Sequence, residues 1–207
     1  MATTIDYTNE DVVSTLFATA YTDELHKYLG LDPAVSAANQ PVDVDELLHD
    51  ALHIIEGDQF RNILQKPVTL ELPYSAFTAR DNKVYLPYGS VSSVTSFTWT
   101  ESDDTTSTLV EGTDYTLYGN EPAFLWAENW FSVMSDLNTS NPEVVTIVYT
   151  TGYSAFAEIP RGTLSAIKVL CYYLFNNRGL DDIPLPVAYK HQVSQAMANN
   201  RRALEYV

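Results

Sequence analysis

The first part of the chain, up to about residue 65, carries apolar residues at helical spacing in two stretches. Gly30, Pro33 and a small, polar segment at 35–41 separate the two stretches. The first stretch, after possible capping residues Thr8 and Asn9, contains Val13, Leu16, Phe17, Ala20, Tyr21, Leu25, Tyr28 and Leu29. The second, with Asp43 or Asp45 as a cap, contains Val44, Leu47, Leu48, Ala51, Leu52 and Ile55. We expect two helices, the second continuing past Gly57 through Phe60, Ile63 and Leu64.

The pattern changes at about residue 67, where apolar residues begin to alternate over short runs separated by turn residues. The clearest alternations are Thr95, Phe97, Trp99 and Val145, Ile147, Tyr149. The candidate strands are Val68–Leu72, Lys83–Leu86, Val94–Thr100, Ser107–Val110, Tyr115–Tyr118, Ala123–Trp126 and Val144–Thr150. This pattern indicates a small antiparallel sandwich or barrel.

Helical spacing returns after Pro160, which is suited to the first turn of a helix. Gly179 is placed to end that helix, and a last helix is predicted over 187–205. The apolar face of the first of these helices contains Leu164, Ile167, Cys171, Leu174 and Phe175; that of the second contains Tyr189, Val193, Ala196, Met197 and Leu204.

Together these patterns predict an α+β protein: an α-helical bundle with an inserted antiparallel β-sandwich-like domain. We expect residues 1–66 and 155–207 to form the helical core, because neither part alone has enough apolar surface for a stable bundle. Residues 67–154 would form the inserted β domain.

Charge narrows the choice of partners. The net charge is −16, with 24 acidic and 5 basic residues up to Ile159, against 3 acidic and 6 basic residues after it. An acidic body argues against a protein that grips nucleic acid, because DNA affinity comes largely from lysine and arginine. Two interpretations stay open: the acidity only keeps the protein in solution, or it lets DNA pass without sticking.

One arrangement resembles a metal site: His49 and His53 lie one helical turn apart. A zincin has Glu after the first histidine, and here that residue is Asp50, whose shorter side chain would reach a metal-bound water poorly. Glu56 lies on a similar face, but no further glycine-and-histidine extension follows. We therefore expect a solvated helix face, with no metal and no cofactor.

Motifs for nucleophilic catalysis are also missing from the sequence. Cys171 falls within an apolar stripe, and the pairs Asp103-Asp104 and Asp181-Asp182 fall in turn-like segments. The 14 tyrosines fit core or subunit-interface positions better than a sugar-binding face, which remains the alternative. We predict that the protein is not an enzyme.

The single cysteine excludes an internal disulfide and suits a reducing compartment. The start of the chain lacks the basic and apolar regions of a signal peptide, and no apolar run reaches the length of a membrane span. We expect neither secretion nor a membrane anchor.

The end of the chain combines basic and apolar side chains. The candidate docking residues are Arg201, Arg202, Leu204, Tyr206 and Val207. Arginine and tyrosine are favoured interface anchors, so we predict that this tail docks into a partner. The alternative is a frayed, solvated helix end.

Several segments, taken in order, resemble a known family. They read TDELHKYLGLD at 22–32, DELLHDALHIIE at 45–56, VYLPYGSVSSVTSF at 84–97 and VVTIVYTTGY at 144–153, followed by Ile159-Pro160 and a helix ending at 176–179. This order and spacing resemble the head–tail connector (adaptor, or head-completion) proteins of tailed bacteriophages. The resemblance covers roughly 22–202; the stretch before Tyr21 looks like an added helix, and the β insertion is longer than usual around 126–141.

The resemblance implies a structural virion protein that forms a homo-oligomeric ring, commonly of twelve subunits, between the portal protein and a downstream stopper or tail protein. DNA would pass through its lumen without specific binding, and the C-terminal tail would reach into the portal. The protein would reside in the virion neck, and in the host cytoplasm during assembly. The alternatives are another tail-interface protein (stopper or tail terminator), a virion carbohydrate-binding module, or a hydrolase that uses His49 and His53.

Overall fold

The computed structural model describes residues 2–5, 17, 19–31, 43–59, 61–78, 82–119, 122–134, 136–138, 144–177, 185–187 and 189–190. Within these residues the chain divides into two compact units. The β unit contains residues 2–5 and 65–152, and the helical unit contains residues between 17 and 64 and between 153 and 190. Helices and antiparallel sheets are both present, which confirms the predicted α+β class.

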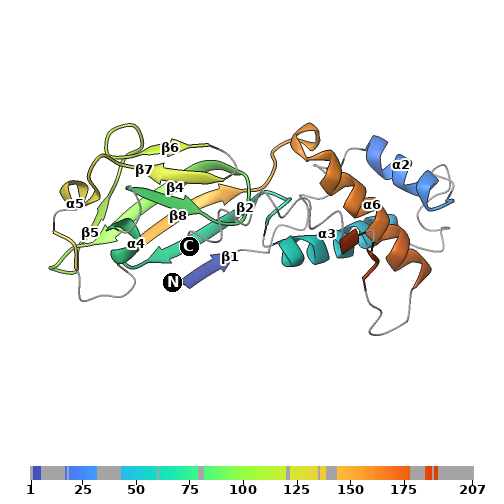
Figure 1. Cartoon of the computed structure of the whole chain (residues 1–207), viewed down its shortest axis with the longest axis horizontal. Helices are drawn as coiled ribbons and strands as arrows, with labels where there is room; N and C mark the ends of the chain where they lie inside the picture. The colour runs from blue at the N-terminus through green and yellow to red at the C-terminus, as the bar shows by residue number, and fades with distance from the viewer. Residues whose placement is uncertain are drawn as a thin grey trace. The chain divides into compact units, whose positions relative to one another are not determined.

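The β unit contains two antiparallel sheets (Figure 1). The five-stranded sheet has the order β1-β2-β8-β4-β5, and the three-stranded sheet has the order β3-β7-β6. The strands of the first are β1 (Ala2–Ile5), β2 (Lys66–Leu72), β4 (Val91–Thr100), β5 (Thr106–Thr108) and β8 (Val145–Thr151). Those of the second are β3 (Lys83–Leu86), β6 (Thr116–Tyr118) and β7 (Ala123–Trp126). Two short helices, α4 (Ser75–Thr78) and α5 (Trp130–Val133), lie in the connections.

Both sheets contribute to one hydrophobic core, because alternate side chains of each strand point to the same face. Val68, Leu70 and Leu72 from β2 meet Val84 and Leu86 from β3 in this core. The rings of Phe77, Phe97 and Trp130 lie within 6.0 Å of one another, centroid to centroid, and are almost fully buried. Strand alternation in the sequence predicted the strand that carries Phe97, whereas Phe77 and Trp130 lie on the short helices α4 and α5, which were not predicted.

All seven strands predicted from the sequence are present, with small differences at their ends. Strand β4 starts at Val91 rather than Val94, and two register shifts against β8 interrupt its first residues. Because a bulge breaks the two-residue period, the sequence pattern did not reveal that part of the strand.

Strand β1 was not predicted, since the sequence analysis assigned residues 1–66 to the helical part. Ala2 pairs with Glu71 and Ile5 with Val68, so β1 extends the five-stranded sheet beyond β2. A strand of four residues is too short to show a period of its own. Its formation depends on the main-chain groups that the edge of β2 offers.

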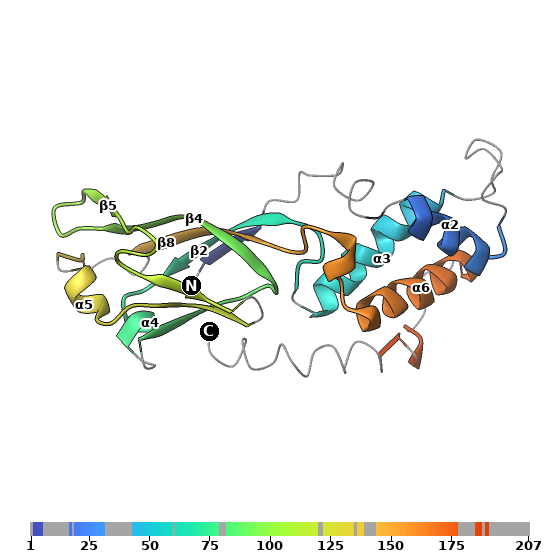
Figure 2. The ribbon, with the colours of Figure 1, turned by 90° about the horizontal axis from the view of Figure 1, so that it is seen from above.

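The helical unit contains α2 (Thr19–Tyr28), α3 (Val44–Gln59) and α6 (Arg161–Asn176), which share a second hydrophobic core (Figure 2). Leu25 from α2, Leu48 and Ile55 from α3, and Ile167 and Leu170 from α6 are almost fully buried there. All of these residues except Leu170 belong to the stripes predicted from the sequence. Tyr189 joins this core, and its hydroxyl donates a hydrogen bond to Asp58 Oδ2 (2.9 Å).

The expectation that α3 continues to Leu64 is wrong. The helix ends at Gln59, and the main-chain N–H groups of Ile63 and Leu64 turn back toward Glu56 instead of following the helix. Helix α6 begins after Pro160, as predicted, and its C-cap is Asn177. Gly179 and most of the predicted helix over 187–205 lie outside the described residues.

Candidate functional site

His49 and His53, the residues considered for a metal site, both lie on α3, with His53 exposed and His49 half-buried. Glu56, the possible third ligand, is buried and its Oε1 accepts hydrogen bonds from the N–H groups of Ile63 (2.7 Å) and Leu64 (3.0 Å). Among the described residues, no three His, Cys, Asp or Glu side chains are grouped so that they could hold a metal ion. Glu56 closes the loop after α3.

This loop is also fixed from the other side by Tyr153, which follows β8. The N–H of Tyr153 donates to the carbonyl oxygen of Ile63 (3.0 Å), and the Arg61 guanidinium lies 5.2 Å from the centroid of the Tyr153 ring. Such a stacked cation and aromatic ring attract each other. Within the helical unit, Glu56, Arg61 and Tyr153 thus hold the loop after α3 in place.

Cys171, the one candidate nucleophile, is fully buried on α6. Its Sγ donates a weak hydrogen bond to the carbonyl oxygen of Leu47 (3.6 Å). Burial, with a smaller contribution from the charge of Asp50, raises the pKa of the Cys171 thiol to about 12. A thiol in this state is not a nucleophile near neutral pH.

The pair Asp103-Asp104 forms a turn, as the sequence suggested. Asp103 Oδ1 accepts hydrogen bonds from the hydroxyl (2.6 Å) and the N–H (3.0 Å) of Thr105, and these bonds lower the pKa of the Asp103 carboxyl. Asp104 Oδ1 accepts a hydrogen bond from Asn138 Nδ2 (3.0 Å). The two carboxylates therefore hold separate parts of a loop. The second pair, Asp181-Asp182, lies outside the described residues, as do Arg201, Arg202, Leu204, Tyr206 and Val207 of the predicted tail.

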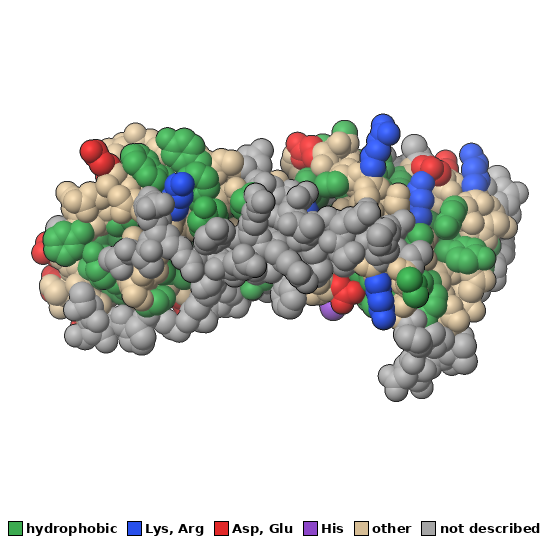
Figure 3. Space-filling view, in the orientation of Figure 1, with side chains coloured by type: hydrophobic (Ala, Val, Ile, Leu, Met, Phe, Trp, Pro, Cys, Tyr) green, Lys and Arg blue, Asp and Glu red, His purple; other side chains and the backbone are tan. Residues whose placement is uncertain are grey.

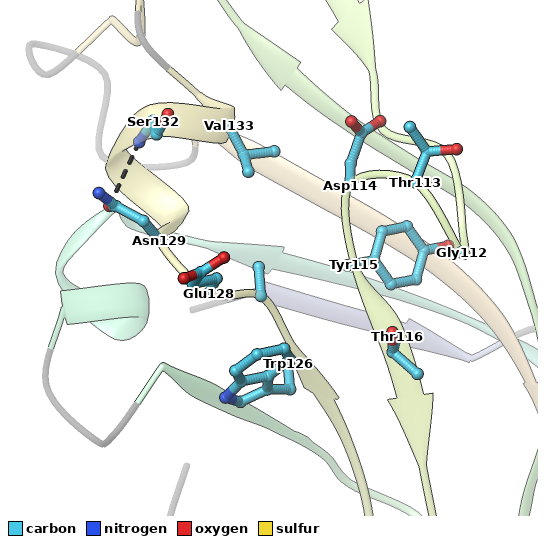
Figure 4. A pocket seen from close by; sticks show the side chains of 11 residues that line it. Gly112, Thr113, Asp114, Tyr115, Thr116, Trp126, Glu128, Asn129, Ser132 and Val133 are labelled. Carbon is cyan, nitrogen blue, oxygen red and sulfur yellow. Dashed lines mark hydrogen bonds between the residues drawn. The ribbon is translucent and has the colours of Figure 1, made fainter.

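A pocket of about 640 Å³ opens in the β unit between the start of β6, the end of β7 and α5 (Figure 4). Its lining residues are Gly112, Thr113, Asp114, Tyr115, Thr116, Trp126, Ala127, Glu128, Asn129, Ser132 and Val133.

Several polar groups of this pocket have structural partners. Asp114 Oδ2 accepts a hydrogen bond from the N–H of Val110 (2.8 Å), and Asn129 Oδ1 caps α5 through the N–H of Ser132 (3.3 Å). Burial, and then the nearby charges of Glu111 and Asp114, raise the pKa of Tyr115 to about 12. None of the eleven lining residues is a histidine, cysteine or lysine.

The outward side of the three-stranded sheet carries an unusual set of side chains, which we call the aromatic face: Lys83, Tyr85, Tyr118, Phe124 and Trp126. Their strand neighbours Val84, Leu86 and Leu125 point into the core. Tyr118 is 45% exposed, and the other four are half-buried. Figure 3 shows hydrophobic side chains gathered over β6 and β7, with a basic side chain among them.

Cross-strand pairing brings these side chains together. Tyr85 and Tyr118 both pair with Phe124, from opposite sides, and Lys83 pairs with Trp126. The Phe124 ring lies 5.6 Å from that of Tyr85 and 5.5 Å from that of Tyr118, which is stacked on it. Lys83 Nζ lies 5.3 Å from the centroid of the Phe124 ring. The face is therefore a continuous cluster across all three strands.

The pattern of the sequence predicts the three strands but does not reveal this face. The available signal was the alternation in β3 and β7, where Tyr85, Phe124 and Trp126 stand at positions that are normally polar in a half-exposed strand. The order β3-β7-β6 was needed to see that Tyr118 completes the cluster.

No protein-family model matches the chain, and no curated protein sequence matches it. The structure is nevertheless similar to chains in three solved assemblies of gene transfer agent (GTA) particles. The first is the neck of an empty particle computed with C6 symmetry (TM-score 0.65, 16% identity), and the second is the virion of the native particle (TM-score 0.66, 15% identity). The third is the neck of the native particle computed with C12 symmetry (TM-score 0.62, 15% identity). Each likeness covers 94% of this chain and 94% of the other. The chain thus shares its fold with chains of the neck and virion of gene transfer agent particles.

Proposed function

We propose that this protein is a structural head–tail connector subunit in the neck of a tailed, phage-like particle. The observation that carries the proposal is the likeness in fold, over nearly the whole length of both chains, to chains of GTA necks and virions. The ordered sequence segments between 22 and 179 support the same function independently.

The proposed assembly is a homo-oligomeric ring of twelve subunits between the portal and a downstream stopper or tail protein. The necks of the similar GTA particles were computed with C6 and with C12 symmetry; both support a cyclic ring, and C12 supports this number. Each subunit of such a ring presents two different faces to its neighbours. The helical segments on either side of residues 65–152 would form a bundle that carries the β unit as an inserted sandwich.

The proposed role is mechanical rather than catalytic. The ring would seal the filled head and offer a platform to the tail, with DNA passing through its lumen. The net charge of −16 supports passage without specific binding, because an acidic surface repels phosphates. The buried thiol of Cys171 and the occupied carboxylate of Glu56 support a structural use of these groups.

Electron microscopy of the purified chain, alone and mixed with the portal protein of the same particle, tests the proposal. We expect closed rings on the portal, whether or not the chain forms rings alone. A chain that stays monomeric and never decorates the portal would contradict a connector function.

One observation favours a second candidate, a virion carbohydrate-binding module. Tyr118 and its neighbours form a partly exposed aromatic cluster, and sugar rings commonly stack on aromatic side chains. This candidate requires a monomer that binds an oligosaccharide, and glycan-binding assays on the same preparation distinguish the two functions.

A further inference from the structure

We infer that the aromatic face is a contact surface for a second copy of this chain. The inference rests on the proposed ring and adds the surface by which neighbouring subunits meet. Its starting point is that β3 and β7 carry aromatic side chains on their outward side as well as apolar side chains on their core side.

An antiparallel sheet that packs on a core with one side usually presents polar residues on the other. Here the core side holds Val84, Leu86 and Leu125, and the outward side holds Tyr85, Phe124 and Trp126. A contiguous, partly exposed apolar surface of this kind marks an interaction site more often than an ordinary solvent-facing side of a sheet. Tyrosine and tryptophan are also the residues that contribute most at protein interfaces.

Charge supports another copy of this chain as the partner. Among the described residues of the β unit the basic residues are Lys66, which is buried, and Lys83, which stands within the aromatic face. The described acidic residues of this unit are Glu71, Glu101, Asp103, Asp104, Glu111, Asp114, Glu128 and Asp136. A face with a cation on an otherwise acidic unit is complementary to a different, acidic face of the same chain, as a head-to-tail ring requires.

The ring geometry favours a protein partner over a sugar. Phe124, at the centre, is flanked by Tyr85 and Tyr118 and covered by Lys83. The ring of Tyr118 is nearly parallel to that of Phe124 (19°) but steeply inclined to that of Trp126 (79°). This uneven surface lacks one shared plane for a pyranose chain, whereas side chains of a neighbouring subunit can interdigitate with it.

Two substitutions test the surface from different sides. Tyr118→Asp places a charge at the most exposed ring of the face, and Lys83→Glu reverses its cation. The matched control is Tyr172→Asp on α6, because Tyr172 is 49% exposed and contacts Tyr28 edge to face at 5.8 Å. Circular dichroism melting verifies that every variant is folded before assembly is measured.

Assembly is measured by native mass spectrometry and electron microscopy, with and without the portal. We expect rings from the unaltered chain and from Tyr172→Asp, and at least tenfold weaker subunit association in Tyr118→Asp and Lys83→Glu. Raised salt would restore part of the association of Lys83→Glu by screening the new repulsion.

The possible outcomes distinguish the proposed connector function from the assignment of the aromatic face as a subunit contact. If the unaltered chain forms no ring even in the presence of the portal, the proposed function fails. If it forms rings and both face variants form them equally well, or if Tyr172→Asp loses them too, the assignment of this face fails while the connector function stands. A monomer that binds a soluble oligosaccharide, and loses it in Tyr118→Asp, would replace the subunit contact with a sugar site.

Discussion

Buried polar side chains of this protein form hydrogen bonds with main-chain groups in the turns next to its helices and strands. Glu56 accepts two N–H groups in the loop after α3, and the indole N–H of Trp130 donates to the carbonyl oxygen of Asn82 (2.9 Å). The Tyr149 hydroxyl donates to the carbonyl oxygen of Pro87 (3.2 Å). A buried main-chain group without a hydrogen-bond partner lowers the stability of the fold. These side chains therefore stabilise turns whose main-chain groups are not paired within a sheet or a helix.

Replacing Glu56 tests this use of a carboxylate. In Glu56→Ala the N–H groups of Ile63 and Leu64 lose their acceptor, and we expect a loss of about 2–5 kcal/mol in the free energy of unfolding. Glu56→Gln keeps a neutral acceptor and should lose less, about 1 kcal/mol. Urea denaturation followed by helical circular dichroism measures both.

The control for Glu56 is Glu46→Gln, an exposed position on the same helix. We expect its stability to stay within about 0.5 kcal/mol of that of the unaltered chain. Equal stability of Glu56→Ala and the unaltered chain would show that the loop does not depend on the carboxylate.

At the level of elements, the five-stranded sheet depends on segments far apart in the sequence. Strand β8 lies between β2 and β4, and the N-terminal strand β1 adds to the outer edge of β2. Every second N–H group of β2 points toward β1, and the four paired residues of β1 protect these groups from exchange with solvent.

Deleting residues 1–5 therefore has a specific expected effect on hydrogen exchange. Every second amide of β2, those directed toward β1, should exchange faster, while the amides directed toward β8 keep their protection. Amide exchange measured by nuclear magnetic resonance resolves the two sets. Faster exchange along the whole of β2 and β8 would instead mean that β1 supports the entire sheet.

At the level of the whole molecule, the chain combines an acidic body with a more basic C-terminal part. The 48 residues after Ile159 carry 6 of the 11 basic side chains, and two of these are Arg201 and Arg202 of the proposed docking tail. A connector subunit has to meet the portal, its ring neighbours and the tail, and the aromatic face accounts for only one of these contacts.

Removing the residues after Asn199 separates the portal contact from the ring contact. If the tail docks into the portal, we expect the truncated chain to bind the portal at least tenfold more weakly while its subunit association is unchanged. Sedimentation of portal mixtures with the full and truncated chains measures the difference. Equal binding by both chains would assign portal recognition to another part of the protein.

The amino-acid sequence by itself determined the positions of most elements, because the spacing of apolar residues is a local property. The period of two placed Ala123–Trp126 in a strand, and the stripe from Leu164 to Phe175 marked α6. Missing motifs also led to the prediction that the protein is not an enzyme, and the charge of −16 argued against a protein that grips nucleic acid, before any geometry was considered.

Only the tertiary structure decided what depends on contacts between distant segments. It paired β1 with β2, turned Ile63 and Leu64 back onto Glu56, and joined β3, β7 and β6 so that four aromatic rings and Lys83 form one face. The register and order of the strands bring these residues together, and neither can be predicted from the local spacing of apolar residues. The sequence thus set the elements, and long-range pairing set the surface by which we propose that the subunits meet.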